Sequence, residues 1–261
     1  MFSLDKRCIY KNNQLAEVIC QLRFPEILAI SAHLPVDFQE AIRSDYPQYS
    51  ARKEAAAPQI VGTPGHLNLE NQPTTINYQF TSADGIWQIN LTSTFIALAC
   101  KQYVCWEEFA KKLDNLLAVF IKIYNPAYFA RIGLRYVNFI SKKNLDVVDL
   151  PFCKLIQPMY LGVLADHEVD ESNATRSSVD AEFAIRGGCR AKILAGLGRV
   201  QKNGIDDGEV KFIFDQDLYM KGNIPVNYSA GALQTLHSQA FPIFRHAISD
   251  RLHEALEPTP I

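Results

Sequence analysis

The stretch YFARIGLRYVNFI, at residues 128–140, decides how the fold is interpreted. Ile132 and Leu134 fall on one side of an extended chain, and Arg131 and Arg135 fall on the other side. Successive side chains of a β-strand point to opposite faces of its sheet. The stretch therefore predicts a strand with one apolar face and one face that carries two guanidinium groups.

A second stretch of this kind, EVICQLRF, lies near the start of the chain at residues 17–24. When Leu22 is aligned with Leu134, both stretches have an arginine directly after the leucine and an aromatic residue after the arginine. Two similar strands, each opening one half of a chain, predict an internal duplication. We expect one α+β half at residues 1–126 and another at residues 127–261, packed as one structural unit with their opening strands at the centre.

Each half shows the same order of elements: a strand, a short helix or irregular segment, about three strands, and a long helix. In the first half, the strands are predicted at 75–81, 87–91 and 95–100 and the long helix at 106–124. In the second half, the strands are predicted at 178–185, 189–197 and 209–215 and the helix at 229–256, with a kink at Pro242. Antiparallel strands with long helices packed on one side are typical of the α+β class. We expect pseudo-duplicated β-α-βββ-α halves, which would resemble the saddle of the TATA-binding fold or a helix-grip arrangement.

The composition is that of a globular protein with a sizeable core, since 48% of the 261 residues are hydrophobic and 21% are charged. The net charge is −2 and no block of Lys and Arg is present, so a broad surface for duplex nucleic acid is not expected. No apolar stretch reaches the roughly 20 residues of a membrane-spanning helix, and the first residues, MFSLDKRCIYKNN, lack the apolar core of a signal peptide. We therefore expect a cytoplasmic protein without membrane association, whose six cysteines are reduced thiols.

The arginines of the two opening strands form the first candidate site. Arg23, Arg131 and Arg135 would share one face of the sheet, and Glu17 and Gln21 lie on that face beside Arg23. Guanidinium groups bind carboxylates and phosphates through paired hydrogen bonds. We predict that these residues contact a small anionic ligand or a protein partner. The alternative is that Glu17 and the arginines form ion pairs between neighbouring strands and serve only the structure.

The sequence Asp215-Gln216-Asp217 forms a second candidate site. It places two carboxylates on one face at a predicted strand end, as a divalent-metal site requires. A third ligand would have to come from Asp180 or Glu182. The pattern is common by chance, so a metal here is not the favoured interpretation, and no cofactor is predicted.

Three aromatic residues of the predicted strands, Trp87, Tyr136 and Phe183, could stack on the bases of single-stranded nucleic acid. Their alternation is equally that of a buried sheet face, which is the favoured interpretation. His237 lies on the apolar stripe of the last predicted helix, where a core histidine with a hydrogen-bond partner is favoured over a catalytic base or ligand. No serine or cysteine lies in a nucleophile-elbow context, and no glycine-rich phosphate loop is present.

Several of these stretches together resemble a sporadically distributed, uncharacterised family of prokaryotic proteins. The resemblance spans nearly the whole chain and is carried by EVICQLRF, WQINLTSTFIAL, YVCWEEF, RIGLRYVNFI and the Leu-His pair of the last helix. It implies no known activity, cofactor or catalytic residue. The patchy distribution of the family implies genes exchanged on mobile elements, some of them beside defence systems. The polar positions that match are Arg23, Arg131, Arg135 and His237.

The sequence favours a non-enzymatic binding protein over an enzyme without deciding between them. The partner would be a protein or a small anionic ligand held on the polar face of the central strands. One alternative is a metal-dependent hydrolase or nucleotide-processing enzyme that uses Asp215 and Asp217, and another is a protein that binds single-stranded nucleic acid. Self-association is also open, because the apolar residues 27–30 and the tail 258–261 could each form an interface.

Overall fold

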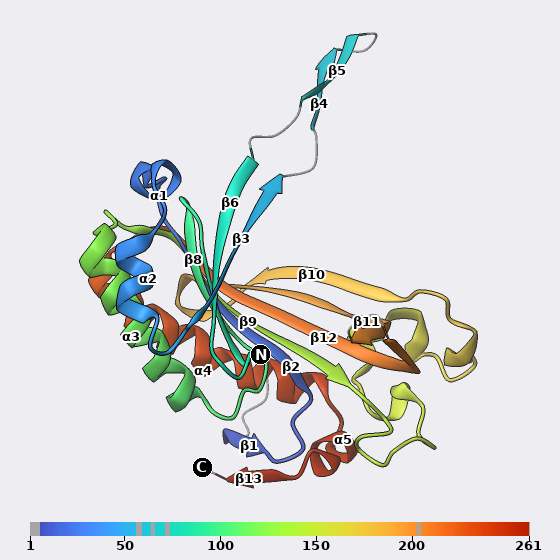
Figure 1. Ribbon diagram of the computed structural model, residues 1–261. Helices are drawn as coiled ribbons and strands as arrows, with labels where there is room; N and C mark the ends of the chain where they lie inside the picture. The colour runs from blue at the N-terminus through green and yellow to red at the C-terminus, as the bar shows by residue number, and fades with distance from the viewer. Residues whose placement is uncertain (1–5, 56–58, 64–65, 71–73, 203–204, 261) are drawn as a thin grey trace.

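The computed structural model describes residues 6–55, 59–63, 66–70, 74–202 and 205–260 (Figure 1). Its largest element is one antiparallel sheet, whose strands in spatial order are β10 (Ser178–Ala184), β11 (Arg190–Lys202), β12 (Ile205–Ile224), β9 (Phe129–Ile140), β2 (Leu15–Arg23), β8 (Phe95–Cys100), β7 (Trp87–Leu91), β6 (Thr74–Thr81) and β3 (Gln48–Ala55). Strands from both predicted halves therefore belong to a single sheet. Together with the helices, this sheet gives the predicted α+β architecture.

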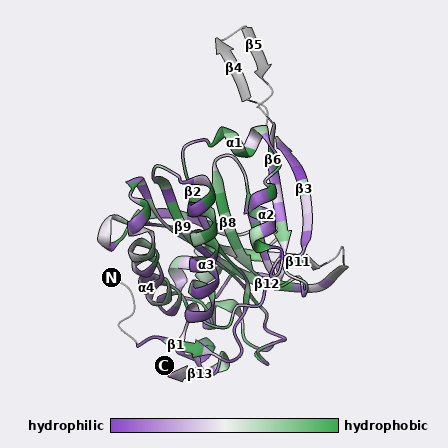
Figure 2. Ribbon diagram, turned by 60° about the vertical axis from the view of Figure 1, so that its left-hand side comes forward, coloured by the Kyte–Doolittle hydropathy of each residue, from purple (hydrophilic) through white to green (hydrophobic). Residues whose placement is uncertain are grey.

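The two long helices, α3 (Trp106–Tyr124) and α4 (Ser229–Ala247), lie on one side of this sheet, and Figure 2 views the molecule from that side. The shorter helices are α1 (Leu28–Ala32), α2 (Val36–Ile42) and α5 (Asp250–Ala255). Phe109 of α3 packs on Trp87 with ring centroids 5.7 Å apart, and Phe120 packs on Phe24 at 5.0 Å. Within the described ranges, no helix is both long and apolar enough to cross a membrane.

The strands β2 and β9 form the central pair of the sheet. They run antiparallel, with Cys20 opposite Leu134 and Leu22 opposite Ile132. All four side chains are fully buried, on the side where the long helices pack. The apolar face that the alternation predicts for the two stretches is therefore the face that meets the helices.

Two small pieces of sheet lie outside the nine strands. β4 (Gln59–Thr63) and β5 (His66–Glu70) pair antiparallel as a separate hairpin, labelled in Figure 1. β1 (Cys8–Tyr10) pairs with β13 (Pro258–Pro260), so the first and last described elements lie side by side. The sequence predicts no strand at the residues of β1 or β3, because neither stretch shows a hydrophobic alternation.

β12 is the largest departure from the predicted strands. It spans Ile205–Ile224 instead of 209–215, and Asp215 and Asp217 lie near its middle instead of at a strand end. Gln216, between them, is 3% exposed on the helix side. A polar residue on the buried face of a strand breaks the apolar alternation from which its length is predicted.

The C-terminal helix also differs from its prediction. α4 continues through Pro242 and ends at Ala247. The next residue, Ile248, has an extended backbone (φ −104°, ψ 150°) and forms an isolated antiparallel β-bridge with Ile156. The Ser249 Oγ then accepts a hydrogen bond from the backbone N–H of Leu252 at 3.2 Å and caps α5. The predicted helix at 229–256 is therefore two helices, and strand-like pairing at Ile248, not proline, separates them.

Candidate functional site

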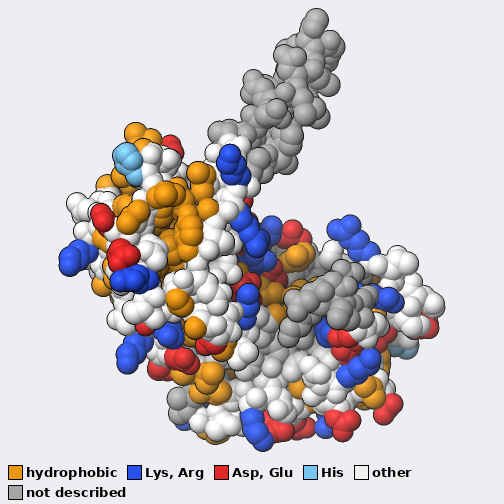
Figure 3. Space-filling model, in the orientation of Figure 1, with side chains coloured by type: hydrophobic (Ala, Val, Ile, Leu, Met, Phe, Trp, Pro, Cys, Tyr) orange, Lys and Arg blue, Asp and Glu red, His pale blue; other side chains and the backbone are white. Residues whose placement is uncertain are grey.

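We call the side of the nine-stranded sheet that faces away from α3 and α4 the open face. In Figure 3 the surface is hollowed between the β3–β6 end and the β10–β12 end of the sheet, and Lys, Arg, Asp and Glu side chains lie in the hollow. The strand registers place on this face Glu17, Gln21 and Arg23 of β2, Asn77 and Gln79 of β6, Gln88 and Asn90 of β7, Arg131 and Arg135 of β9, Asp180 and Glu182 of β10, Arg190, Lys192 and Leu194 of β11, and Asp215, Asp217 and Tyr219 of β12. The five residues of the predicted arginine site therefore share one face.

Arg131 forms an ion pair across the strand boundary. Its Nη2 donates to Oδ1 and Oδ2 of Asp217 at 2.9 and 2.7 Å, and its guanidinium carbon lies 4.6 Å from the centre of the Tyr219 ring. The side chain reaches Asp217 by passing over Gly133, where a Cβ atom would lie 2.2 Å from Nη1. A glycine at this position is thus what allows the guanidinium to lie flat on the sheet.

Arg135 forms the second ion pair, with Asp215. Its Nε and Nη2 donate to the two carboxylate oxygens at 2.7 and 2.5 Å, a forked geometry that fixes both side chains. The Asp215 carboxylate, with added charge from Asp217 and Glu17, raises the pKa of Arg135 above its usual value. Burial raises the pKa of Glu17, and the charges of Lys101 and Arg135 partly offset that rise.

Arg23 differs from the other two arginines. It is exposed, and its Nε donates to the amide oxygen of Gln21 at 3.0 Å. It lies opposite Arg131 in the β2–β9 register. The site predicted from the sequence therefore consists of two arginines with carboxylate partners and one arginine with a neutral partner. The carboxylates come from Asp215 and Asp217, and not from Glu17 as the structural alternative expected.

The aspartates of the predicted metal site are engaged by arginines. Asp215 and Asp217 each bind a guanidinium group, so a cation would have to displace it. The two residues considered as a third ligand also have basic partners: Lys192 Nζ lies 3.5 Å from Asp180, and Arg190 Nη1 lies 3.1 Å from Glu182. Within the part of the chain that is described, no three His, Cys, Asp or Glu residues are grouped as metal ligands.

A cluster of amides on the other half of the open face was not predicted. The Oδ1 of Asn90 accepts from the side-chain amides of Gln79 and Gln88 at 3.2 Å each and from Asn77 at 3.4 Å. Asn77 also donates to Glu54 at 2.8 Å. The polar positions of the strands TTINYQFT and WQINL signal this cluster, but only the pairing of β6 with β7 brings the amides together.

The aromatic rings proposed for base stacking do not lie on the open face. Trp87 and Tyr136 are 7% and 6% exposed and pack on the helix side of the sheet. Phe183 follows the same side by the β10–β11 register. Placement on the helix side corrects the stacking hypothesis for these three residues and agrees with a core face, the interpretation that the sequence favoured.

His237 is a core histidine with a hydrogen-bond partner on one ring nitrogen. Its Nδ1 lies 3.0 Å from the hydroxyl oxygen of Tyr136, and its ring stacks on Trp106 with centroids 4.3 Å apart and an interplanar angle of 7°. Burial of the ring lowers the pKa of His237 to about 4, with a further lowering from the charge of Arg7. The imidazole is therefore neutral at physiological pH.

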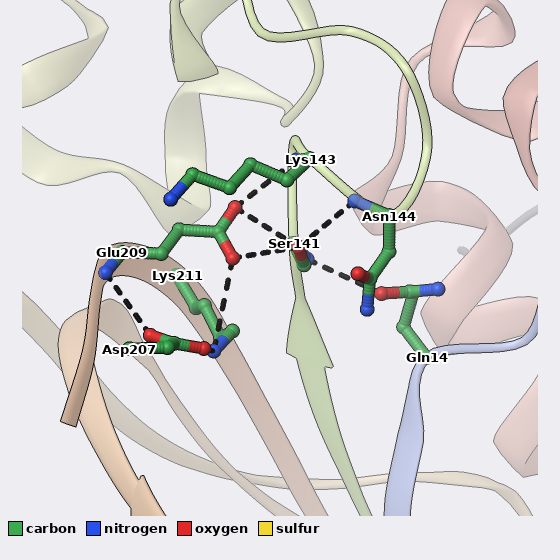
Figure 4. A network of polar contacts seen from close by, with 7 residues as sticks. All are labelled: Gln14, Ser141, Lys143, Asn144, Asp207, Glu209 and Lys211. Atoms are coloured by element: carbon green, nitrogen blue, oxygen red, sulfur yellow. Dashed lines mark hydrogen bonds and ion pairs between the residues drawn. The ribbon is translucent and has the colours of Figure 1, made fainter. Parts of the chain in front are cut away.

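A buried carboxylate ties the end of β9 to β12 (Figure 4). Glu209 accepts from Ser141 Oγ at 2.9 and 2.7 Å and from the backbone N–H of Lys143 at 3.1 Å, and Lys211 Nζ lies 3.7 Å away. The backbone N–H of Ser141 donates in turn to Gln14 at 3.3 Å. Because both carboxylate oxygens have donors, this network holds the loop after β9 in place and offers no free group for chemistry.

No family model and no curated protein matches the chain. The resemblance to an uncharacterised prokaryotic family stays a prediction. Function is therefore inferred from the geometry of the chain itself.

Proposed function

We propose that this chain is a non-enzymatic binding protein that engages another protein through the open face. The proposal rests on one observation: α4 and the segment 150–175 cover the same side of the sheet, opposite the open face. α4 packs on the helix side, where Phe244 contacts Phe214. The segment 150–175 packs on that same side, where Phe152 contacts Phe212 and Tyr160 contacts Phe214. The polar residues of the opposite side are left to face a partner.

The charges of the open face favour a protein as the partner. Ion pairs on this face join Arg131 to Asp217, Arg135 to Asp215, Lys192 to Asp180 and Arg190 to Glu182. Nucleic acid binds to surfaces with an excess of positive charge. A surface that carries both signs is matched instead by a protein surface with the complementary pattern.

A small anion is a weaker candidate, because two of the three arginines already hold carboxylates. An anion would have to compete with Asp217 for Arg131 or with Asp215 for Arg135. Arg23 is exposed, and its Nε donates to the neutral amide of Gln21. We therefore assign the partner contact to Arg23. The amides of β6 and β7 lie on the same face, beyond β8.

We further propose that the two halves are related by duplication and that both shape the open face, as in a saddle. Matching Leu22 to Leu134 also matches Cys20 to Ile132. In the sheet, Leu22 lies opposite Ile132 and Cys20 lies opposite Leu134. When each residue is replaced by its match in the other half, the first cross-strand pair becomes the second and the second becomes the first. In each half, the strand next to the opening strand is the last one before the long helix, β8 in the first and β12 in the second. Both features are expected of a twofold-related pair.

A charge reversal at Arg23 tests the binding proposal. Tagged protein would be recovered from cells of the source organism, the retained protein identified by mass spectrometry, and its affinity for the purified chain measured. We expect Arg23→Glu to weaken that affinity by about tenfold or more, as substitution of a contact arginine does. Lys111→Glu on the outer surface of α3 is the matched control and should leave the affinity unchanged.

The opposite results would overturn the proposal. Equal affinity for wild type and Arg23→Glu would exclude the open face around Arg23. Salt-dependent binding of an oligonucleotide, lost in Arg23→Glu, would replace the protein partner by a nucleic acid. A larger loss for Lys111→Glu would move the partner to the helix side.

A further inference from the structure

Two residues that line a cavity on the helix side of the sheet each have a buried polar atom without a hydrogen-bond partner among the described residues. The cavity measures about 100 Å³ and lies between β1, the residues before α3, the middle of α4 and the ends of β2 and β9. The proposed function does not use it. Its apolar walls include Ile9, Leu15, Val104, Phe241, Phe244 and Leu256.

The first polar atom is Nε2 of His237. The side chain is 7% exposed and lines the cavity from α4. Its orientation is fixed from two sides, by stacking on Trp106 and by the hydrogen bond between Nδ1 and the Tyr136 hydroxyl. Nε2 itself has no partner among the described residues. A rigidly held imidazole in the cavity wall thus keeps one ring nitrogen without a hydrogen-bond partner among the described residues.

The second polar atom is Oε1 of Gln216. The residue is 3% exposed, lines the cavity from β12 and lies directly opposite Tyr136 in the β12–β9 register. Its Oε1 has no partner in the described part of the chain. A buried acceptor without a donor is costly to the fold, so its persistence points to a donor supplied from outside the chain.

The cavity has no unbalanced charge. Among the described residues that line it, Arg7 carries a formal charge, and its Nη1 pairs with Glu107 at 2.9 Å. His237 is neutral at physiological pH, because burial lowers its pKa to about 4. A charged ligand would enter without a counterion and would lose its hydration, which disfavours it.

We propose that this cavity is a binding site for a small uncharged molecule with an apolar body and a hydroxyl group. A hydroxyl has one O–H and two lone pairs, so it can donate to Gln216 Oε1 and accept from Nε2–H of His237 at the same time. This requires the tautomer whose Nδ1 accepts from the Tyr136 hydroxyl. The apolar body fills the space between Phe241, Phe244 and Leu15. The cavity, at about 100 Å³, is smaller than the closed cavity of about 150 Å³ that is known to hold benzene. It is open to solvent on one side, so a single ring or a short chain can extend past its mouth. Ordered water is the competing occupant, at about 30 Å³ for each molecule.

Phenol and toluene are a matched pair of probes, because they differ in a hydroxyl against a methyl group. Binding to the full chain would be measured by calorimetry and by the ¹⁵N resonances of the His237 ring. We expect phenol to bind in the millimolar range or tighter, as its size allows, and to shift the Nε2 resonance. Toluene should bind about tenfold more weakly, because it leaves Gln216 Oε1 without a donor. Benzoate, which has the same ring with a charge, should not bind.

Two variants of the cavity lining separate a specific site from a hole filled with water. Gln216→Leu removes the acceptor and should reduce the preference for phenol over toluene, because only the contact with His237 Nε2 remains. Ala240→Leu adds volume to the lining on α4 and should abolish binding of both. The melting temperature of each variant shows whether it is folded. If the larger side chain at position 240 disrupts α4, the Gln216→Leu variant by itself still tests the proposal.

Three outcomes would overturn the proposal. The first is no Nε2 shift with phenol, which leaves water as the occupant. The second is equal affinity for phenol and toluene in the wild-type chain. The third is full binding to a folded Ala240→Leu variant, which places the probe elsewhere.

Discussion

Arg131 folds its guanidinium group over Gly133, two residues along the same strand. A Cβ atom on Gly133 would lie 2.2 Å from Nη1 of Arg131, well inside any tolerated contact. The missing side chain therefore leaves the path along which Arg131 reaches Asp217 of β12. The ion pair is thereby held on the open face between β9, the first strand of the second half, and β12, the last strand before its long helix.

Replacing Gly133 by alanine should displace Arg131 from Asp217 without unfolding the sheet, because the displaced atoms are the far end of a flexible side chain. We expect the free energy of unfolding, measured with urea, to fall by about 1–2 kcal/mol. In an Arg131→Met background the same change should cost nothing, since alanine also restricts the unfolded chain more than glycine does. An equal loss in both backgrounds would assign Gly133 a different role.

The buried histidine should make stability depend on pH. Burial lowers the pKa of His237 to about 4 from an ordinary value of 6.5. Between these values the unfolded chain binds a proton that the folded chain does not, so stability is full above about pH 6.5 and falls as the pH drops toward about 4. The loss should reach about 3 kcal/mol. His237→Gln should flatten this part of the urea-denaturation profile, and parallel profiles for both proteins would refute the cause.

The two leucines of the central strands should respond alike to truncation. Leu22 and Leu134 are both fully buried, and under the proposed duplication they occupy equivalent places. Leu22→Ala and Leu134→Ala should each lower the free energy of unfolding by roughly 2–5 kcal/mol, with closely similar values. Leu194→Ala, at an exposed position of the open face, is the control and should change it by less than about 0.5 kcal/mol. Very different losses at the two leucines would count against equivalent surroundings.

The Glu209 carboxylate should matter more than its exposed neighbour Asp207. Glu209 is 8% exposed and accepts from Ser141 and from the backbone of Lys143, whereas the Asp207 side chain is 53% exposed. Glu209→Gln should lower the melting temperature, through a loss of about 1–3 kcal/mol, because an amide cannot accept on both sides. Asp207→Asn should cost less than about 1 kcal/mol. The reverse order would mean that the surface pair with Lys211 anchors the loop.

Alternation and periodicity were enough to predict the elements whose two faces differ in polarity. β2, β6, β7 and β9 follow the predicted strands closely, and α3 begins and ends at the predicted residues. Neither β3 nor the full length of β12 was predicted, and the reason is physical in each case. β3 is an edge strand with exposed side chains on both faces, and β12 buries Gln216 where an apolar residue would be expected.

The candidate sites could be predicted only in part. The local pattern places Arg131 and Arg135 on one face, but their partners depend on β12 lying next to β9, a contact between residues about 80 apart in the chain. Likewise, the pattern places His237 on an apolar stripe. Only the packed fold shows that His237 and Gln216 line one cavity, and that neither Nε2 of His237 nor Oε1 of Gln216 has a partner in the described part of the chain.

Site-specific photo-crosslinking in cells of the source organism tests most directly whether the open face binds a protein. A photoreactive residue would replace Leu194, which is 41% exposed on β11, or Gln88 on β7, with Val163, 71% exposed in the segment on the helix side, as the control. We predict protein adducts from Leu194 and Gln88, their loss on adding Arg23→Glu, and none from Val163. Adducts from Val163 with none from Leu194 or Gln88 would contradict the assignment of the binding surface.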